Sequence, residues 1–291
     1  MELLTIFTPT YNREKKLYDT FLSLKKQSNT NFVWLIVDDG STDNTEKEVK
    51  KWIKNCNFSI VYKKKNNGGK HTAYNYALQF LKTKYVYLSL DSDDVIYDEN
   101  TIDKIIHELE SLKKKVGLIT LCSNSRNGHN DFVKKYDLTK LKGKSLAYAY
   151  THNIFHAEAR MILQTDYVKQ FRYPEIENER FFTEAYVYYQ MNEPVKWTNI
   201  ITSYSEYLED GLTANANSLF VKNPKSWYLY NELRMRKNKS ILLKLKFAVY
   251  YISFGILSNQ KVLKYSMIYN MLLILLYPLG ICGALYLKKK G

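Results

Sequence analysis

The chain has few of the residues that define several common classes of protein. Its 291 residues include three cysteines, Cys56, Cys122 and Cys282, which lie far apart and form no Cys-x-x-Cys pair. A disulfide framework and a zinc ribbon are therefore excluded, and a reducing compartment is expected. Eleven glycines and five prolines are too few for a linker-rich chain. Residues 1–8 have the pattern of a strand rather than of a leader peptide, so export is not expected.

Acidic residues are missing from the end of the chain. The net charge is +14, yet Glu232 is the last acidic residue and 11 basic residues follow it. Without those 11, the chain has 32 basic and 29 acidic residues, so its body is nearly neutral. The basic tail is also the most apolar part of the sequence. This combination indicates an anionic membrane surface rather than nucleic acid as the partner.

The first 120 residues alternate short apolar runs with segments of helical periodicity. The predicted strands are 3–8, 32–37, 58–62, 85–90 and 116–121, and the predicted helices are 14–27, 42–54, 69–81 and 100–112. Ser41 or Thr42 is expected to cap the second helix. Strands that are apolar almost throughout predict an α/β fold, in which helices cover both faces of a mostly parallel central sheet.

Polar loops follow the first four predicted strands, at 8–13, 38–41, 66–71 and 91–94. In open α/β sheets, ligands bind beyond the carboxyl ends of the strands, so these loops are candidates for one site. Asp91 and Asp93 are spaced to share a hard cation, although Asp also favours turns and helix caps. Gly69 and Lys70 open a helix and suit an anion, although glycines there also suit a turn.

Together these four segments resemble the GT-A glycosyltransferases of family 2. The resemblance rests on Thr-Pro-Thr-Tyr-Asn-Arg at 8–13, Asp-Asp-Gly-Ser at 38–41, Asn-Gly-Gly-Lys at 67–70 and Asp-Ser-Asp-Asp at 91–94, and it covers about residues 1–125. It implies an inverting enzyme with a GT-A (Rossmann-like) domain, a nucleotide-sugar donor, usually a UDP-sugar, and Mn²⁺ or Mg²⁺ as cofactor.

The resemblance also assigns roles to individual residues. Residues that line the nucleotide pocket would be Pro9, Tyr11 and Arg13, with Asp38 or Asp39 contacting the uracil and ribose and Gly69 and Lys70 near the base or diphosphate. Within the Asp91–Ser92–Asp93 signature, Asp91 would contact the ribose or sugar and Asp93 would ligate the metal, with Asp91 as its second ligand.

A general base must come from the second half of the chain. The Glu-Asp pair that many family members use is absent, but residues 179–184 resemble a branch with a Glu-x-Phe-x-x-Glu pattern. Glu184 is therefore the candidate base and Glu179 the second candidate. An acidic first turn that stabilises a helix is the alternative explanation for both.

Residues 207–213 resemble a segment that closes over the site in relatives. Arg160 could contact a phosphate, but nothing in the neighbouring sequence decides its role.

The tail contains 23 consecutive residues without a charge, at 265–287, preceded by a largely apolar helical segment at 240–257. Such a stretch is long enough to span a bilayer. A peripheral or re-entrant position at the cytoplasmic face of the cell membrane is expected, with a single span and a packed helix pair, soluble or in a homo-oligomer, as alternatives. The expected parts are 1–122 for the donor, 123–232 for the acceptor and base, and 233–291 for the membrane.

The sequence thus predicts a glycosyltransferase that extends a lipid-linked or oligosaccharide acceptor during surface-polysaccharide synthesis. Two alternatives remain: a polyprenyl-phosphate sugar transferase, and a non-catalytic module that binds a nucleotide-sugar or a membrane. A nucleic-acid partner is not expected, because the positive charge lies in the apolar tail.

Overall fold

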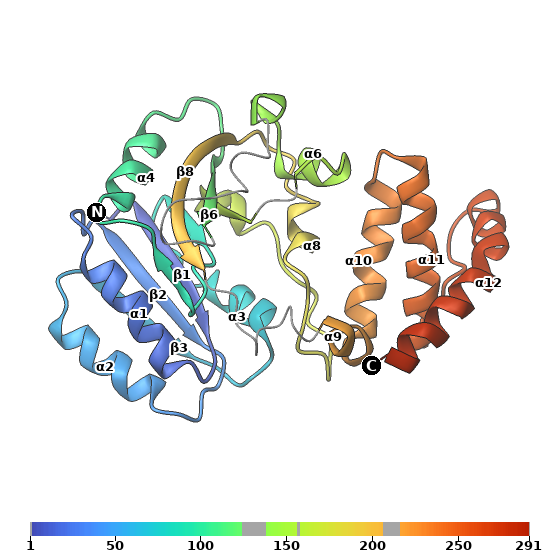
Figure 1. The fold of residues 1–291 in the computed structure, drawn as a ribbon, viewed down its shortest axis with the longest axis horizontal. Helices are drawn as coiled ribbons and strands as arrows, with labels where there is room; N and C mark the ends of the chain where they lie inside the picture. The colour runs from blue at the N-terminus through green and yellow to red at the C-terminus, as the bar shows by residue number, and fades with distance from the viewer. Residues whose placement is uncertain (1, 124–137, 156–157, 206–215, 291) are drawn as a thin grey trace. The chain divides into compact units, whose positions relative to one another are not determined.

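The computed structural model describes residues 2–123, 138–155, 158–205 and 216–290 (Figure 1). The chain forms two compact units that are interleaved along the sequence. The first, here called the sheet unit, comprises Met1–Leu146, Phe155–Arg172 and Asn192–Tyr207. The second, the helical unit, comprises Ala147–Ile154, Tyr173–Met191 and Leu208–Gly291.

One eight-stranded mixed sheet organises the sheet unit, with strand order β3-β2-β1-β4-β7-β6-β8-β5. The strands β1 to β4 are parallel, whereas β7 runs antiparallel to both β4 and β6. Their bounds are Leu4–Thr10 (β1), Phe32–Asp38 (β2), Ser59–Lys64 (β3), Tyr85–Leu88 (β4), Asp94–Ile96 (β5), Gly117–Ser123 (β6), Ala159–Gln164 (β7) and Lys196–Ser205 (β8). The chain moves outward from β1 through β2 to β3 and then returns to β4 on the other side of β1, so β1 and β4 flank a switch point where α/β sheets bind ligands.

Helices cover both faces of this sheet, as the alternating pattern predicts. Their bounds are Glu14–Lys25 (α1), Thr45–Asn55 (α2), Lys70–Ala77 (α3), Thr101–Glu110 (α4) and Thr165–Val168 (α7), with a 3₁₀ turn at Leu138–Leu141. On one face, Phe21 of α1 stacks on Trp52 of α2 with 4.7 Å between ring centroids, above Trp34 of β2. On the other face, Tyr74 of α3 packs edge-on against Phe7 of β1. Alternate side chains of one strand therefore enter different layers.

Several local expectations need correction. The predicted helix at 69–81 is α3, which ends at Ala77 because the N–H groups of Gln79 and Phe80 bond to carbonyls three residues back. The N-cap of α2 is Asn44 rather than Ser41 or Thr42. Helix α2 begins at Thr45 rather than at 42, because the side chain of Asp43 accepts hydrogen bonds from the backbone N–H and hydroxyl of Thr45 at 3.1 and 2.6 Å. Strand β4 ends at Leu88, two residues early, because Ser89 takes a positive φ of 60° that an extended strand cannot continue through.

The helical unit is built from helices α6 (Leu146–Thr151), α8 (Ala185–Tyr188), α9 (Ala216–Lys222), α10 (Pro224–Lys237), α11 (Ile241–Leu257) and α12 (Met267–Lys290). The longer three, α10 to α12, form a second core around Tyr228, Phe247, Tyr251 and Leu273. Ser240 caps α11 by accepting a hydrogen bond from the N–H of Leu243 at 3.4 Å. The two apolar segments of the tail are thus helices α11 and α12, close to the predicted bounds.

Candidate functional site

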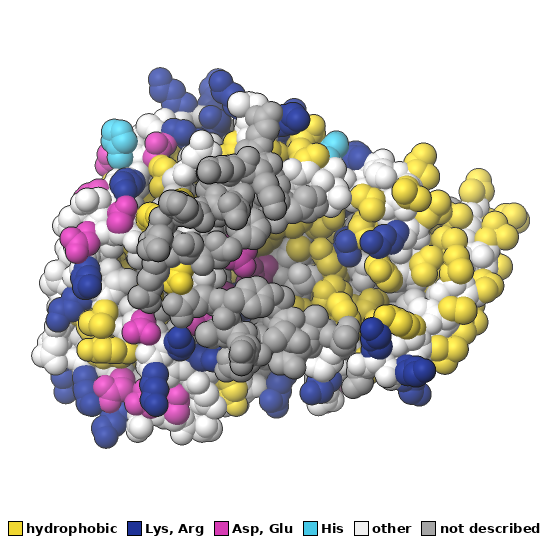
Figure 2. All heavy atoms as spheres, in the orientation of Figure 1, with side chains coloured by type: hydrophobic (Ala, Val, Ile, Leu, Met, Phe, Trp, Pro, Cys, Tyr) yellow, Lys and Arg dark blue, Asp and Glu magenta, His cyan; other side chains and the backbone are white. Residues whose placement is uncertain are grey.

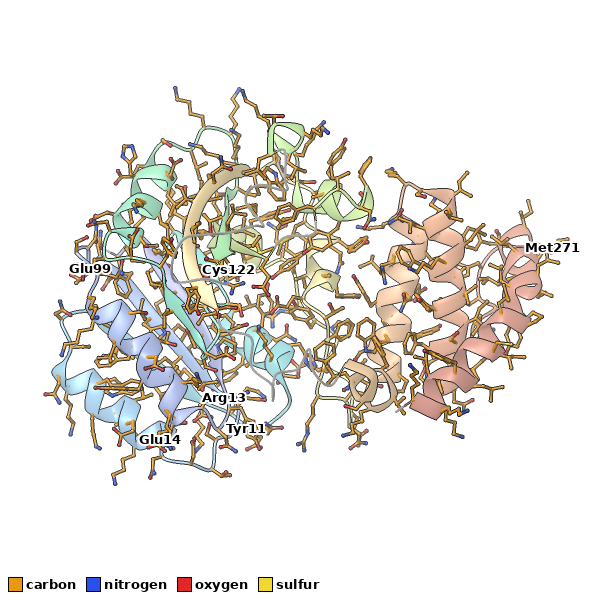
Figure 3. All side chains as sticks on the ribbon, in the orientation of Figure 1. Tyr11, Arg13, Glu14, Glu99, Cys122 and Met271 are labelled. Atoms are coloured by element: carbon orange, nitrogen blue, oxygen red, sulfur yellow. The ribbon has the colours of Figure 1, made fainter. Side chains whose placement is uncertain are left out.

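The polar loops that follow β1 and β2 are joined through Asn12. Its side-chain oxygen accepts a hydrogen bond from the backbone N–H of Thr42 at 2.8 Å, and its own N–H donates to the hydroxyl of Ser41 at 2.9 Å. Asn12 has a φ of 50°, in the left-handed region that Asn tolerates better than most residues. This contact fixes the position of the residues on either side, the exposed Tyr11 and the half-buried Arg13 (Figure 3). Pro9 is buried at the end of β1.

Asp38 and Asp39 are both buried, but they have different partners. Asp38 accepts a hydrogen bond from the backbone N–H of Ser41 at 2.6 Å and another from the hydroxyl of Tyr62 on β3. Burial and this negatively charged neighbour raise the pKa of Tyr62, so the phenol stays a hydrogen-bond donor at neutral pH. Asp38 therefore holds the turn after β2 in place.

Asp39 connects the loop after β2 to the glycine-rich loop after β3. Its carboxylate accepts hydrogen bonds from the backbone N–H groups of Gly68 at 3.0 Å and Gly69 at 2.6 Å, and it forms an ion pair with Lys65 at 2.8 Å. The anion that these glycine amides bind in this structure is thus the Asp39 side chain. Gly69 has a φ of 95°, which only glycine adopts without strain.

Lys70 connects the start of α3 to the loop after β4. Its ammonium group lies 2.6 and 2.8 Å from the two carboxylate oxygens of Asp91. Ser89 also donates its hydroxyl to Asp91, at 2.5 Å. Although burial raises the pKa of the Asp91 carboxyl, the positive charges of Lys70 and Arg160 outweigh it and hold that pKa below its usual value. Asp91 is therefore ionised at neutral pH.

The pKa of the Asp93 carboxyl is shifted in the opposite direction, above its usual value. Burial and the nearby Asp91 carboxylate raise the pKa of Asp93, and the charges of Arg13 and Lys70 compensate only in part. A divalent cation would relieve this repulsion, so the pair fits Mn²⁺ or Mg²⁺. No group of three His, Cys, Asp or Glu side chains suited to a metal occurs among the residues that the structure describes. Mg²⁺ sites with one or two carboxylates, completed by water and substrate phosphates, have this composition.

Behind this pair lies an ion pair whose partner the sequence could not identify. Asp94, the first residue of β5, is buried and lies 2.6 Å from a guanidinium nitrogen of Arg160 on β7, whose side chain is 13% exposed. The Asp94 carboxylate also accepts a hydrogen bond from the backbone N–H of Asp91 at 3.3 Å. Thr20 of α1 donates to the carbonyl of Asp94 at 2.7 Å, next to the buried Ser92. Arg160 therefore holds Asp94 in place, and Asp94 in turn supports the Asp91–Asp93 loop.

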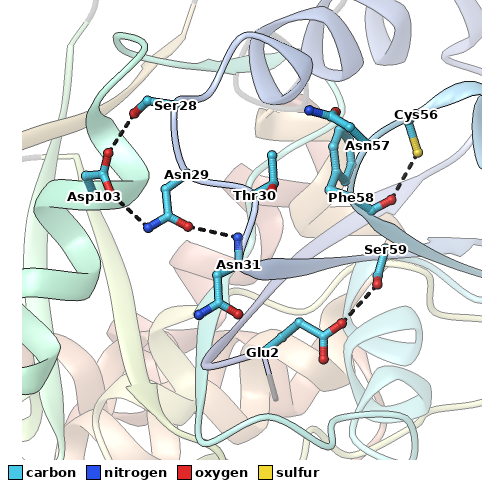
Figure 4. Close-up of a pocket in the computed structure, with 10 residues that line it drawn as sticks. All are labelled: Glu2, Ser28, Asn29, Thr30, Asn31, Cys56, Asn57, Phe58, Ser59 and Asp103. Carbon is cyan, nitrogen blue, oxygen red and sulfur yellow. Dashed lines mark hydrogen bonds between the residues drawn. The ribbon is translucent and has the colours of Figure 1, made fainter.

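A separate hollow lies at the other end of the strands. It is lined by residues that precede or begin β1 to β3, among them Glu2, Asn31 and Ser59, and by Asp103 of α4 (Figure 4). Its polar groups bond to one another, as Ser28 and Asn29 do to Asp103 at 2.6 and 2.8 Å. Because the four polar loops lie at the carboxyl ends, this hollow is not part of the candidate site.

The two candidate bases both lie in the helical unit, in different environments. Glu184 immediately precedes α8, is half-buried, and accepts a hydrogen bond from the hydroxyl of Tyr188 at 3.3 Å. Glu179 is 9% exposed, and its two oxygens accept hydrogen bonds from the backbone N–H groups of Lys225 and Ser226, both at 2.7 Å. Glu179 thus occupies the N-terminus of α10. Residues 207–213 lie outside the described residues, because the structure does not describe 206–215.

Comparison with known proteins identifies the group to which the chain is related. Residues 5–169, more than half of its length, match the family "Glycosyl transferase family 2". The chain belongs to this family. The matched residues contain all four polar loops and Arg160.

Several members of the family are similar over longer or shorter stretches. The minor teichoic acid biosynthesis protein GgaB of Bacillus subtilis is 23% identical over 82% of this chain, and glycosyltransferase GlyG of Streptococcus pneumoniae is 31% identical over 38%. The β-N-acetylglucosaminyltransferase TarP of Staphylococcus aureus, which acts on poly(ribitol-phosphate), is 23% identical over 76%. The chain spans 26% of GgaB, 36% of GlyG and 67% of TarP. It is thus related to glycosyltransferases of teichoic acid synthesis.

Solved structures have the same fold. The crystal structure of residues 1–349 of S. aureus TarS in complex with UDP-GlcNAc superposes with a TM-score of 0.58 and 19% identity, over 97% of this chain and 81% of that one. A mannosyltransferase from Pyrobaculum calidifontis, in complex with GDP-Man and Mn²⁺, gives a TM-score of 0.56 at 14% identity, over 99% and 75%. The fold is thus GT-A, as the sequence predicts.

Proposed function

We propose that this chain is an inverting glycosyltransferase that moves a sugar from a UDP-sugar to a hydroxyl group of a lipid-linked or glycan acceptor in surface-polysaccharide synthesis. The observation that supports it most strongly is the continuous set of contacts at the carboxyl ends of β1 to β4. Asn12, Asp39 and Lys70 each tie one loop to the next, and the series ends at Asp91 and Asp93. A structural role alone would not require a second, partly repelled carboxylate at this point.

The nucleotide would lie across these loops. The exposed Tyr11 would offer a ring face to the base, and the half-buried Arg13 would offer a positive charge to the diphosphate, in keeping with the roles that the resemblance assigns to them. Asp38 and Asp39 sit beneath them and fix the loop geometry. UDP-GlcNAc is the first donor to test, because TarS binds it, whereas the P. calidifontis mannosyltransferase binds GDP-Man.

Asp93 and Asp91 would hold Mn²⁺ or Mg²⁺ against the donor. A bound cation stabilises the negative charge that develops on the leaving diphosphate. Lys70 keeps Asp91 ionised and adds a positive charge beside it. Of these two carboxyl groups, Asp93 is the one whose pKa is raised, and an approaching cation would favour its charged form.

Glu184 would accept the proton of the attacking hydroxyl. It is half-buried and accepts a hydrogen bond from the hydroxyl of Tyr188, whereas Glu179 is almost fully buried against α10. General-base catalysis of this kind is worth about 10²–10⁴-fold in rate. Glu179 is the weaker candidate, since both of its oxygens already bind backbone N–H groups of α10.

The reaction would take place at the cytoplasmic face of the cell membrane, with residues 233–291 in contact with an anionic lipid surface. One helix among the described residues, Met267–Lys290, is long and apolar enough to cross a membrane. Only 17% of its most apolar 18-residue stretch is buried. A lipid-linked acceptor would be presented at such a surface.

The deciding experiment measures nucleotide binding by titration calorimetry. UDP, GDP and dTDP would each be titrated with and without Mn²⁺ into the wild type and Asp93→Asn. We expect UDP to bind most tightly, to need the metal, and to lose that dependence in the variant. A folded protein that binds none of the three nucleotides would refute the proposal.

The acceptor class is tested separately with Glu184→Gln. If the acceptor is a hydroxyl, the variant should lose about 10²-fold or more in kcat while UDP binding is unchanged. A lipid phosphate is already a nucleophile and needs no strong base, so an unchanged kcat would instead favour a polyprenyl-phosphate sugar transferase.

A further inference from the structure

The outermost helix of the helical unit, α12, has a buried stripe and a wide exposed apolar face. Leu273, Gly280 and Ala284 are the buried residues of this helix. At 3.6 residues per turn they fall within an arc of about 40°. On the opposite side, Met271, Leu275, Leu279 and Tyr286 are 56%, 77%, 57% and 58% exposed and fall within about 80°. Figure 2 shows apolar side chains over this part of the unit, and Figure 3 shows Met271 on its outer side.

The buried stripe packs closely on the middle of α11. A methyl group on Gly280 would lie 2.3 Å from a side-chain carbon of Ile252, and one on Gly283 would lie 2.4 Å from the hydroxyl of Ser253. That hydroxyl donates a hydrogen bond to the carbonyl of Gly280 at 3.0 Å. A larger side chain at either position would require Ile252 or Ser253 to move, so α12 packs closely on α11 along one side.

Behind α11 lies a polar helix. Tyr251 of α11 stacks on Tyr228 of α10, with 4.7 Å between ring centroids. The ring centroid of Phe247 in α11 lies 3.5 Å from the guanidinium carbon of Arg234 in α10. Helix α10 also carries Glu232, which forms an ion pair with Lys264 at 2.9 Å. The layers therefore run from charged α10, through mostly apolar α11, to α12.

This layering is incompatible with α12 crossing a bilayer. The hydrocarbon core is about 30 Å thick, so the middle of a spanning helix lies at its centre. Packed helices are about 8–10 Å apart, so α11 and much of α10 would enter the hydrocarbon together with the middle of α12. Arg234, whose guanidinium group packs on Phe247 of α11, would then be brought toward lipid, where charged side chains are costly.

We infer that α12 lies in the plane of the membrane, immersed in one leaflet through the face formed by Met271, Leu275, Leu279 and Tyr286, while its opposite side stays on α11. The occupant of this face is an anionic lipid leaflet. The charges agree with this, since Lys261 and Lys288–Lys290 lie at the two ends of α12 and no acidic residue follows Glu232. The inference rests on the proposed membrane association, but not on the proposed transfer reaction.

The depth of single probes along α12 tests this orientation. In a Cys56→Ser, Cys282→Ser background, where Cys122 is buried, Met271→Cys, Leu279→Cys and Tyr286→Cys would each carry an environment-sensitive fluorophore. The protein, with all of residues 1–291, would be mixed with vesicles of phosphatidylglycerol and phosphatidylethanolamine that contain a quencher at a shallow or a deep acyl position. Lys50→Cys on exposed α2 serves as the control.

We expect all three α12 probes to shift to shorter wavelength and to be quenched to similar extents, more by the shallow quencher than by the deep one, with no change at Lys50→Cys. Strong deep quenching at Leu279→Cys alone would indicate a spanning helix and overturn the inference. The inference would also fail if no probe were quenched by lipid and sedimentation showed a dimer that covers this face. Circular dichroism of each labelled variant checks that it is folded. Since no donor or acceptor is present, these results are independent of whether the chain is a transferase.

Discussion

Arg160 and Asp94 show how one buried pair can support a binding loop. The two side chains are 13% and 4% exposed and 2.6 Å apart, and Asp94 also accepts the N–H of Asp91. Removal of one partner from a buried pair leaves an uncompensated charge and costs about 3–5 kcal/mol. We expect Arg160→Leu to lower the free energy of unfolding by about this amount and to weaken metal-dependent UDP binding.

The control for Arg160→Leu is Lys104→Ala, which breaks the exposed Lys104–Asp98 pair at 2.6 Å. An exposed pair is worth about 1 kcal/mol or less. Denaturant unfolding of both variants gives the comparison. Equal losses in the two variants would contradict the role given to Arg160.

Gly40 provides a second test at the scale of the residue. It has a φ of 85°, and a methyl group there would lie 2.9 Å from the backbone nitrogen of Asn67. Gly143 also has a positive φ, of 69°, but nothing lies within 4 Å of its methyl position. We expect Gly143→Ala to lower the free energy of unfolding by about 1–2 kcal/mol from backbone strain alone.

Gly40→Ala should lower the free energy of unfolding by more in the same assay. It should also weaken UDP binding, because it displaces the loop after β3. A Gly40→Ala variant with wild-type UDP affinity would show that this loop is not needed for the nucleotide.

Among the helices, α10 depends on a cap supplied from another part of the chain. Glu179 binds the backbone N–H groups of Lys225 and Ser226 and the hydroxyl of Ser226 at 2.6 Å. An uncharged side chain loses the favourable interaction with the helix N-terminus and has one acceptor oxygen fewer. We expect Glu179→Gln to destabilise the protein by about 1–2 kcal/mol, measured by chemical denaturation.

Glu184→Gln is the matched control for that variant, because Glu184 immediately precedes α8, whereas Glu179 binds the backbone N–H groups at the start of α10. It should leave stability nearly unchanged and reduce turnover. If the two variants exchanged these effects, with Glu179→Gln stable but inactive, Glu179 would be the base.

The elements of the sheet unit could be predicted from sequence because their signals are local. Apolar runs such as 32–37 and the Asp91–Asp93 spacing depend on neighbouring residues only. The contacts that sequence reasoning missed join distant positions. Asp94 and Arg160 are 66 residues apart, and Glu179 and Ser226 are 47 apart. Strand β5 has three residues, too few for a periodic signal, and its pairing with β8 stabilises it.

For the whole molecule, the absence of a three-residue metal cluster in the described parts of the chain leads to a prediction about metal removal. A chelator should leave the melting temperature unchanged in the absence of nucleotide, because the candidate site offers two carboxylates and needs the substrate phosphates to complete the ligands of the ion. UDP with Mn²⁺ at about 100 times its Kd should stabilise the protein by about 2.7 kcal/mol through binding to the folded state. Thermal unfolding measures both effects. A large drop in melting temperature on chelation alone would indicate a structural metal instead.

The interleaving of the two units affects the order in which the chain can fold during its synthesis. Residues of α6 leave the ribosome early, but their partners come later: the N–H of Ala147 bonds to the carbonyl of Met191 at 2.9 Å, and the carbonyl of Thr151 accepts from the N–H of Lys239 at 3.1 Å. The strands β1 to β4 can pair as soon as they emerge, whereas the helical unit must wait for the final residues. Each nascent chain therefore carries the paired strands β1 to β4 while its most apolar segment is still being translated, and a premature stop after Lys239 would leave Tyr228 and Met235 without the helices that cover them.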